Sequence, residues 1–511
     1  METTAPTPIP PTRFPAWLRL FEPAPPAAAP LTDAAAIQRS YRSWRVRILL
    51  SSIIGYATFY FVRKNLSIAM PFMEKDLGIS KSDLGTFLSL HGVLYGVSKF
   101  ANGFFADRCN ARAFMVVGLA ASALMNVFFG FGSAVATLGA VWMLNGWFQG
   151  MGFPPCARLL THWFPPKQLA TKMSIWNTSH SIGAGAIVVL CGYLVGFNWR
   201  LCFLVPAALA LACAVGLWLA LPDTPPSVGL PEVEGTQAGG AGNPKSSRKA
   251  GRNPKQIRIS GSDENRKTMT EEFSRSSPTT STVAVQSTLE ERESPEAFRA
   301  FVMENVFRNK YIWLVSLANF FVYTLRYAVF DWGPTLLTGA KHIAITGAGW
   351  MMAGFEVSGL IGALLGGWLT DRFFGGRAMR ACVFYMVLAG LSILLFWKFA
   401  GESKLWNTAL LCAAGFFIYG PQCLVGIAAA NLATKRAAAT AVGLTGFFGY
   451  ASTLLSGRGL GVLVERHGWD AGFAGMLGVA AVGTLLFALA WPAKAHGYKS
   501  EEGVVKLQEP T

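Results

Sequence analysis

Runs of about 20 mainly apolar residues recur along the chain, and each is long enough to cross the hydrocarbon core of a bilayer as a helix. Backbone N–H and C=O groups find no water in that core, so each segment must satisfy its own hydrogen bonds. The runs are too long and too continuously apolar for the strands of a β-barrel. The sequence therefore predicts an all-α membrane protein. The twelve expected spans are 46–73, 83–105, 114–131, 135–160, 172–196, 200–221, 310–338, 344–370, 378–398, 405–430, 437–462 and 470–492.

Composition supports this fold class and excludes several functions. Of 511 residues, 52% are hydrophobic and 14% are charged, whereas about a quarter of a soluble protein is charged. The net charge of +16 does not indicate nucleic-acid binding, because the basic residues lie mostly between apolar runs and on the N-terminal tail. The eight cysteines are scattered, with no C-x-x-C spacing, so neither a disulfide nor a metal site is predicted. No phosphate-binding loop or catalytic constellation is visible, so we expect no cofactor, no enzymatic activity and no ATP hydrolysis.

Two segments differ from the apolar runs. Residues 1–45 are rich in Pro and Ala and predict a disordered cytoplasmic tail, and residues 222–309 are rich in Gly, Ser, Pro and charge. The second segment is expected to be a flexible cytoplasmic linker between an N-terminal half, 46–221, and a C-terminal half, 310–492. Residues 493–511 are expected to form a second cytoplasmic tail.

The distribution of Lys and Arg over the short loops predicts the orientation. The positive-inside rule places the more basic loops in the cytoplasm. Both termini and the linker are then cytoplasmic, and the chain is a multi-pass protein of the plasma membrane, in a bacterium the inner membrane. The basic residues that support this orientation are Arg39, Arg42, Arg45, Arg47, Arg108, Arg112, Lys167, Lys172, Arg372, Arg377, Arg380, Lys435 and Arg436.

The two halves repeat one another. GFFADRCNAR at 103–112 corresponds to GWLTDRFFGGR at 367–377, and Pro154-x-Cys156 corresponds to Pro421-x-Cys423. Together with Tyr-x-x-Arg in spans one and seven, the three matches are offset by 264, 267 and 263 residues. A parallel repeat of two six-helix halves is found in secondary transporters, which bind substrate between the halves near the membrane midplane.

An arginine in each half lies inside a predicted span. Arg63 follows Tyr60 in span one, and Arg326 follows Tyr323 in span seven. A charge inside the membrane costs at least about 2.5 kcal/mol, so such residues indicate function. Because the two spans are repeat equivalents, we expect both guanidiniums to face a central cavity. Tyr56 shares the expected helix face of Tyr60 and Arg63.

Two arginines fit a doubly charged anion. The guanidinium is permanently charged and matches carboxylate and phosphate oxygens, and a phosphate ester carries about −1.5 to −2 at neutral pH. A dicarboxylate would also satisfy the pair. Lys99 in span two and His180 in span five, which shares a face with Asn177, are further candidates for this site.

The remaining charges near the spans are expected to form ion pairs that hold or gate the helices. Lys64 points about 100° away from Arg63 on a helix, so we expect it to anchor at the interface or to pair with an acid of the other half. Asp331 and Glu356 are the candidate acids. The repeated loops carry charges that are expected to lock the cytoplasmic side in one state: Asp107, Arg108, Asp371 and Arg372.

Several long motifs resemble one family in the right order. They are GYATFYFVRKN, YGVSKFANGFFADRCNAR, WFQGMGFPPCARLLTHWF, IWNTSH, PDTPPSVGLP, FVYTLRYAVFDWGP and GFFIYGPQCLVGIAAA. Together they resemble the organophosphate:phosphate antiporters of the major facilitator superfamily, and the CARLLT and WNTSH motifs are more similar to its hexose-phosphate and sugar-phosphate-sensor branch. The tail and the linker are longer than usual there, and AVGLTGFFGY in span eleven lacks an acid-and-lysine pair of one hexose-phosphate subgroup.

The resemblance implies a site and a function. It implies the major facilitator fold, with Arg63 and Arg326 on the phosphate and Lys99 and His180 nearby. Tyr56, Tyr60, Asn177 and Tyr323 are implied to line the site. The expected function is exchange of an organophosphate, such as glucose 6-phosphate, for inorganic phosphate by alternating access in a monomer surrounded by lipid. Two alternatives stay open: a sugar-phosphate sensor that acts with a membrane histidine kinase, and a proton-coupled organic-anion transporter.

Overall fold

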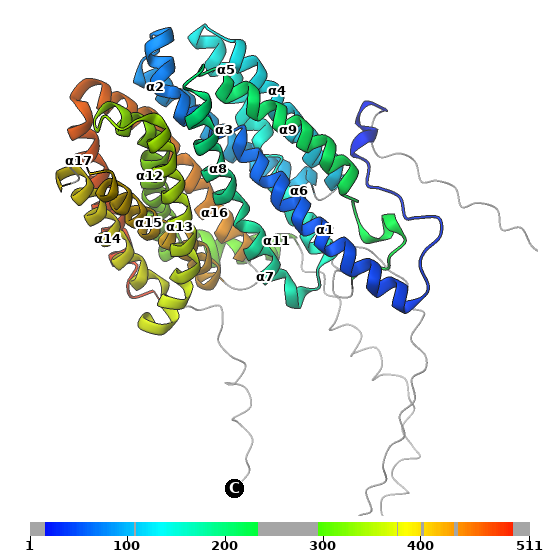
Figure 1. The fold of residues 1–511 in the computed structure, drawn as a ribbon. Coiled ribbons are helices and arrows are strands. Elements are labelled where there is room, and N and C mark those ends of the chain that lie inside the picture. Colours follow the sequence, from blue (N-terminus) through cyan, green and yellow to red (C-terminus); the bar gives the residue numbers. More distant parts are fainter. Residues whose placement is uncertain are drawn as a thin grey trace, which may run out of the picture. The chain divides into compact units, whose positions relative to one another are not determined.

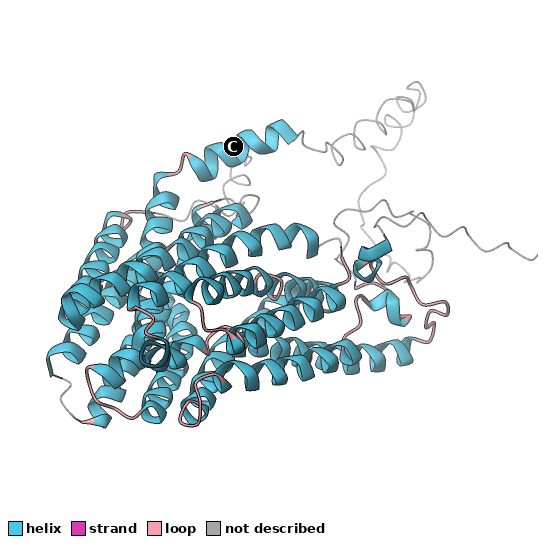
Figure 2. Cartoon of the chain, turned by 90° about the horizontal axis from the view of Figure 1, so that it is seen from above, coloured by secondary structure: helices cyan, strands magenta, loops and turns pink. Residues whose placement is uncertain are grey.

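A computed structural model describes residues 16–106, 109–233, 295–375, 377–399, 403–433 and 438–493. All regular structure in these residues is helical (Figure 2). The helices of the N-terminal half are α1 (Ala34–Phe61), α2 (Leu66–Leu77), α3 (Lys81–Ala106), α4 (Ala111–Phe131), α5 (Val135–Gln149), α6 (Phe153–Trp163), α7 (Pro166–Asn177), α8 (Ser179–Leu194) and α9 (Leu201–Ala220).

The C-terminal half follows the linker. Its helices are α12 (Lys310–Gly339), α13 (Ile345–Phe374), α14 (Ala378–Phe399), α15 (Lys404–Leu432), α16 (Ala438–Ala451), a π-helical turn η5 (Leu454–Gly459) and α17 (Leu460–Leu489). The short elements are η1 (Ala16–Phe21), η2 (Pro225–Val228), α11 (Pro295–Val302) and a π-helical turn η4 (Met303–Phe307). Every one of the twelve expected spans is occupied by helix, and the two groups of helices are coloured blue to green and yellow-green to red in Figure 1.

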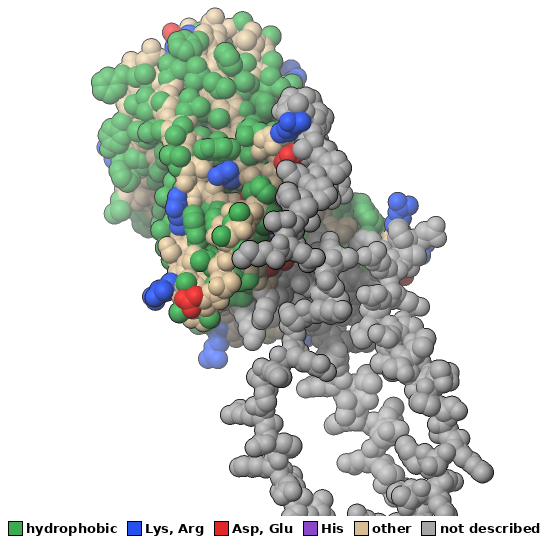
Figure 3. All heavy atoms as spheres, turned by 90° about the vertical axis from the view of Figure 1, so that its right-hand side faces the viewer, with side chains coloured by type: hydrophobic (Ala, Val, Ile, Leu, Met, Phe, Trp, Pro, Cys, Tyr) green, Lys and Arg blue, Asp and Glu red, His purple; other side chains and the backbone are tan. Residues whose placement is uncertain are grey.

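The helices present an apolar surface. In the described part of the chain, eight helical segments are long and apolar enough to cross a membrane. Large apolar side chains are exposed on many helices, including Phe131, Leu219 and Trp368. In the coloured part of the face drawn in Figure 3, the upper surface is covered mainly by hydrophobic side chains, and Lys and Arg side chains lie singly. An apolar surface of this extent is typical of a protein whose solvent is lipid.

The first membrane helix begins earlier than the sequence indicated. Asp33 accepts hydrogen bonds from the backbone N–H groups of Ala35 and Ala36, so it caps α1 at its N-terminus. Residues 34–45, expected to belong to a disordered tail, are therefore helical. The boundary at residue 46 was placed too late, because the Pro-rich composition of the tail masked an Ala-rich helix start.

Residues 16–33 also have a defined structure, which the sequence did not predict. Phe21 accepts a backbone hydrogen bond from Asn110, and Ala27 donates one to the carbonyl of Pro226. The buried carboxylate of Asp223 accepts from the backbone N–H groups of Ala24 and Ala111. The N-terminal segment therefore packs on residues that follow α3 and α9. At the other boundary of the expected linker, α11 and η4 show that residues 295–307 are helical.

The first span is interrupted beside the two cations. The helix breaks at Val62–Asn65, between α1 and α2, so Arg63 and Lys64 do not lie on one continuous helix as the sequence indicated. The free carbonyl of Val62 accepts hydrogen bonds of 2.9 Å from the side-chain amides of Asn126 and Asn145. A break inside a membrane needs such replacement partners for its backbone.

The two halves contact each other most closely near one end of the bundle. Ser89 of α3 donates a 2.7 Å hydrogen bond to the carbonyl of Thr453, and a Cβ added at Gly85 would lie 2.5 Å from the carbonyl oxygen of Gly457. On the other side α8 packs along α13, where the Trp350 indole donates to the Tyr193 hydroxyl at 3.1 Å. Both seams lie towards the end that carries α2, at the top of Figure 1. We call this end the closed end.

Candidate functional site

Arg63 lies at the break between α1 and α2 and is buried among aromatic rings. Its guanidinium carbon is 3.9 Å from the ring centroid of Tyr95 and 5.3 Å from that of Tyr60. A cation at such distances is attracted by the negative face of the ring. Among the described residues no carboxylate lies within ion-pair distance of Arg63. Its positive charge is therefore held by rings and not neutralised by an acid.

Arg326 lies in the middle of α12 and has a different environment. Its guanidinium carbon is 4.4 Å from the ring centroid of Tyr419. A guanidinium nitrogen is 3.7 Å from Oε1 of Glu356, which also accepts a hydrogen bond from the Tyr419 hydroxyl. A separation of 3.7 Å is too long for a hydrogen bond. Glu356 therefore attracts Arg326 without occupying its donors.

Lys64 forms an ion pair that joins the two halves. Its Nζ is 2.5 Å from Oδ1 of Asp331 on α12, and the two side chains are only 8% and 10% exposed. Nζ also lies 4.8 Å from the ring centroid of Tyr327 and 4.9 Å from that of Phe330. Adjacent cations thus have separate partners, since Lys64 meets an acid and Arg63 meets rings.

A chain of tyrosine rings connects the two arginines across the halves. It starts on Arg63 and ends 5.8 Å from the guanidinium carbon of Arg326. Successive ring centroids along it are 4.8, 6.2 and 5.7 Å apart. The rings in order are Tyr95, Tyr450, Tyr323 and Tyr327. This series brings both cations to one buried region between the halves.

Lys99 and His180 reach the same region from α3 and α8. Lys99 Nζ is 3.3 Å from the hydroxyl of Tyr450 and 4.1 Å from the ring centroid of Phe153. The His180 ring centroid lies 6.0 Å from that of Tyr60, and its Nδ1 is bonded to the carbonyl of Asn177. A carbonyl only accepts, so Nδ1 carries the proton and Nε2 is an acceptor. That Nε2 is buried and has no partner in the described part of the chain.

Tyr56 lies deeper in the N-terminal half, in an aromatic cluster. Its ring centroid is 4.7 Å from that of Trp176, 5.7 Å from that of Tyr60 and 6.3 Å from that of Phe153. The cluster packs α1 against α6 and α7 and fixes the position of Tyr60. The side chain of Asn177 is exposed, so this residue contributes its backbone carbonyl to His180.

A small cavity of about 20 Å³ adjoins the ion pair. It is bordered by Arg63, Lys64, His91, Tyr327 and Asp331, among others. A cavity needs about 10–15 Å³ to hold one water molecule. Nε2 of His91, one of the lining residues, is buried without a partner in the described residues.

The expected gating charges are less fully described. Asp107 and Arg108 lie outside the described residues. Asp371 belongs to the last turn of α13, and Arg372 beside it is exposed. The gating role of these four residues therefore stays a prediction. Among the described residues no cluster of three or more His, Cys, Asp or Glu side chains could hold a metal ion.

Comparison with known proteins places this site in a family. The model of the Major Facilitator Superfamily matches residues 52–457. A probable hexose phosphate transport protein of Chlamydia pneumoniae is 36% identical over 487 residues, which cover 95% of this chain and 99% of the relative. The chain belongs to the major facilitator superfamily, in its organophosphate:phosphate antiporter branch.

Other relatives are named for different functions. The glycerol-3-phosphate transporter of Bacillus subtilis is 34% identical, and the match covers 93% of this chain and 98% of the relative. The membrane sensor protein UhpC of Salmonella typhimurium is 32% identical, with 90% and 95% covered. The branch thus holds proteins named for different phosphate esters and one named as a sensor.

A solved structure supports the major facilitator fold. The crystal structure of a bacterial homologue of the human lysosomal transporter Spinster, in an inward-facing and occupied conformation, matches with a TM-score of 0.64. The match covers 88% of this chain and 97% of that one at 14% identity, so it bears on the fold alone. The chain therefore has the all-helical major facilitator fold, with eight apolar membrane-length segments in the described residues.

Four site tyrosines of the transporter were not among the residues predicted from the sequence. They are Tyr95, Tyr327, Tyr419 and Tyr450. Tyr95 precedes Lys99 by one helical turn and shares its helix face, which is the signal that the sequence contains for it. Tyr419 and Tyr450 stand in apolar runs where an aromatic residue is more often part of the packing, so the local sequence gave no signal for them.

Proposed function

We propose that this protein exchanges an organophosphate, namely a sugar phosphate such as glucose 6-phosphate, for inorganic phosphate. The observation that carries the proposal is a buried arginine from each half, Arg63 and Arg326, joined by one chain of tyrosine rings. The arginine donors are the residue type best matched to phosphate oxygens. The names of the relatives, a hexose phosphate and a glycerol-3-phosphate transporter, support the same substrate class.

The charges around the site support a dianion. Four cations and two carboxylates of the described residues meet here, which leaves a formal charge of +2. They are Arg63, Lys64, Lys99, Arg326, Asp331 and Glu356. A phosphate ester with about two negative charges neutralises this surplus. A monoanion would leave an uncompensated charge in a region of low dielectric constant, which is costly.

The neutral groups of the site suit the rest of the substrate. Nε2 of His180 is an unpaired acceptor, so it can accept a hydrogen bond from a hydroxyl of the phosphate or the sugar. The ring of Tyr60 lies beside Arg63, and the ring of Tyr323 lies next to that of Tyr327, which adjoins Arg326. We propose that Tyr56 acts one layer behind them by fixing Tyr60.

The exchange follows from alternating access. Without substrate, the surplus charge opposes the rocking of the two halves. During that movement the site is closed off from water, and an uncompensated charge there is costly. A bound dianion removes that cost. The Lys64–Asp331 ion pair and the seam at the closed end hold the conformation described above, and both must open when the site faces the other side.

We also propose the orientation. The basic loops place both termini in the bacterial cytoplasm, so the closed end faces outwards. The protein acts as a monomer, because each chain supplies both arginines. An outward phosphate gradient would then drive uptake of the sugar phosphate.

The proposal is tested by counterflow in proteoliposomes of the purified protein. Vesicles are loaded with labelled phosphate, and a panel of external phosphate esters is added in turn. Loss of label that depends on an external ester, and that persists when the pH gradient is collapsed, supports exchange.

Two results would overturn the proposal. Binding of the ester without counterflow would show a sensor, as one relative is named. Uptake that collapses with the pH gradient, and that is lost in both Glu356→Gln and Asp331→Asn, would show a proton-coupled transporter.

A further inference from the structure

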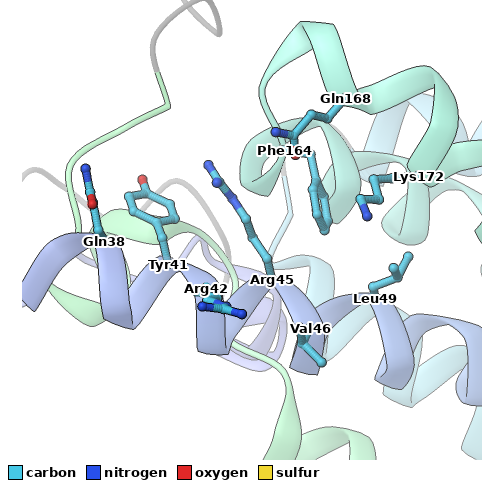
Figure 4. A pocket seen from close by; sticks show the side chains of 9 residues that line it. All are labelled: Gln38, Tyr41, Arg42, Arg45, Val46, Leu49, Phe164, Gln168 and Lys172. Atoms are coloured by element: carbon cyan, nitrogen blue, oxygen red, sulfur yellow. The ribbon is translucent and has the colours of Figure 1, made fainter.

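A pocket of about 590 Å³ lies away from the substrate site, between the first turns of α1 and the α6–α7 junction (Figure 4). Its volume is within the range of sites for small molecules, about 300–1,000 Å³. The residues that line it are Gln38, Tyr41, Arg42, Arg45, Val46, Leu49, Phe164, Gln168 and Lys172.

The pocket is basic. Three of the nine lining side chains are cations, Arg42, Arg45 and Lys172, and none is an acid. Figure 4 shows Arg45 extending from α1 between Tyr41 and Phe164, with Lys172 of α7 on the far side of Phe164. The cations therefore come from both walls, so an anion between the walls would meet charge from each side.

Arg45 is held in place by its Nε, and its two terminal nitrogens are not used in doing so. Its Nε donates a 2.8 Å hydrogen bond to the carbonyl of Trp163, and its guanidinium carbon lies 4.6 Å from the ring centroid of Tyr41. This is its one side-chain hydrogen bond within the described residues. The two terminal nitrogens remain able to donate to an oxyanion, in the fork geometry that suits phosphate.

The pocket lies where the lipid-facing surface of α1 begins. Arg42, Val46, Leu50 and Ile54 follow one another at four-residue intervals, so they form one stripe along the helix. The last three are apolar and are 56%, 53% and 57% exposed. The stripe thus changes from charged to apolar beside the pocket, as expected at the boundary between headgroups and hydrocarbon.

Aromatic residues mark the same boundary. The rings of Trp44 and Tyr41 lie 6.0 and 6.2 Å from that of Trp163. Trp and Tyr gather at the level of the lipid headgroups, where their rings are in apolar surroundings and their polar groups reach water.

We propose that this pocket binds the headgroup of an anionic phospholipid, with its acyl chains along the apolar stripe of α1. Basic pockets between membrane helices near the cytoplasmic surface bind such headgroups. A free phosphate ester carries the same phosphate group as a lipid headgroup. However, Val46, Leu49 and Phe164 give the pocket apolar walls, which would contact a lipid but not a small polar anion. A lipid with two phosphates uses three cations better than a lipid with one.

Lipid binding to the full-length protein in detergent tests the proposal. Native mass spectrometry is used to measure retention of cardiolipin, phosphatidylglycerol and phosphatidylcholine by the wild type and by the double variant Arg42→Gln/Lys172→Gln. We expect wild-type preference in that order of lipids, and about thirtyfold weaker cardiolipin binding in the double variant, since each cation at a membrane surface adds to the attraction. Arg45 is left intact because it holds the chain at Trp163.

Controls separate the pocket from general charge effects. Lys398→Gln removes a cation that also lies over an aromatic ring, 3.7 Å from Trp397, but on α14 and outside the pocket. This variant should bind cardiolipin as the wild type does, and the charge-keeping Arg42→Lys should retain most of the affinity. The double variant keeps both site arginines, so its phosphate counterflow reports separately on the transport proposal.

Two results would overturn the lipid site. Equal cardiolipin retention by the wild type and the folded double variant would show that the pocket does not hold the lipid. Binding of labelled inorganic phosphate that the double variant loses, with lipid binding unchanged, would assign the pocket to a soluble anion.

Discussion

The buried ion pair between Lys64 and Asp331 allows a sharp prediction, since it joins the halves in the conformation described. Asp331→Asn keeps the shape of the side chain but leaves the ammonium group, whose present partner is 2.5 Å away, without a counter-charge in a site only 8% exposed. Breaking a buried pair by removal of one partner costs about 3–5 kcal/mol. Arg63 lies next in the chain and increases the unbalanced charge.

The Lys64–Asp331 pair must separate when the halves rock, so the cost of breaking it destabilises only the conformation described here. A difference of about 3 kcal/mol corresponds to a shift of about 150-fold in the equilibrium between two states. The assay uses Ser89→Cys as a reporter, because Ser89 is buried in the seam at the closed end. In Asp331→Asn the rate of its labelling by a membrane-impermeant thiol reagent should increase at least tenfold.

Two comparisons show whether the unpaired charge is the cause. Glu304→Gln disrupts the exposed Arg308–Glu304 pair, at 3.2 Å, and should change the labelling rate less than twofold because exposed pairs contribute little. The double variant Lys64→Met/Asp331→Leu leaves no charge unpaired and should restore slow labelling. A labelling rate in Asp331→Asn within twofold of the parent would refute the reasoning.

Three further predictions concern the seam, the second arginine and the N-terminal segment. In Gly85→Val the new side chain collides with the backbone of Gly457. Distances between spin labels across the closed end should therefore increase, and an unchanged distance would contradict the close packing. Glu356→Gln removes the negative charge 3.7 Å from Arg326, so in exchange assays the KM for phosphate should fall and the turnover should slow, whereas an increased KM would contradict competition for the arginine. Asp223→Asn weakens the acceptor of two backbone N–H groups and should cost about 2–3 kcal/mol, seen as a lower Tm; a Tm within one degree would show that the N-terminal segment adds no stability.

The helices of this protein were predictable because the signal is local. A run of apolar residues longer than the bilayer core fixes both the helix and its place in the membrane. The break at Val62–Asn65 was not predictable in this way. No Gly or Pro stands there, and the carbonyl freed by the break is satisfied by Asn126 and Asn145 from helices far along the chain.

The part of the site that is repeated in both halves was predictable from the sequence. Arg63 and Arg326 stand out because a charge inside a span is costly and because each has an equivalent in the other half. The sequence left open whether Lys64 anchors at the interface or pairs with an acid of the other half, and the structure shows an ion pair with Asp331. Tyr419 and Tyr450 depend on how the helices of the two halves pack, which no local pattern encodes.

The N-terminal segment shows the limit of composition. Residues 16–33 look like a disordered tail because they are rich in Pro and Ala. They are ordered by partners elsewhere in the chain, above all the carboxylate of Asp223. A segment that cannot form a core of its own can still be fixed by a buried charge that needs its backbone N–H groups.

The central claim is that Arg63 and Arg326 together hold a phosphate dianion. Its most direct test is exchange of labelled phosphate for unlabelled phosphate in proteoliposomes of the wild type, Arg63→Lys and Arg326→Lys. Lysine keeps the charge but loses the planar fork of donors, so each single variant should lose at least about 99% of the exchange, a factor of 100 or about 2.7 kcal/mol. Normal exchange by both lysine variants would contradict the account.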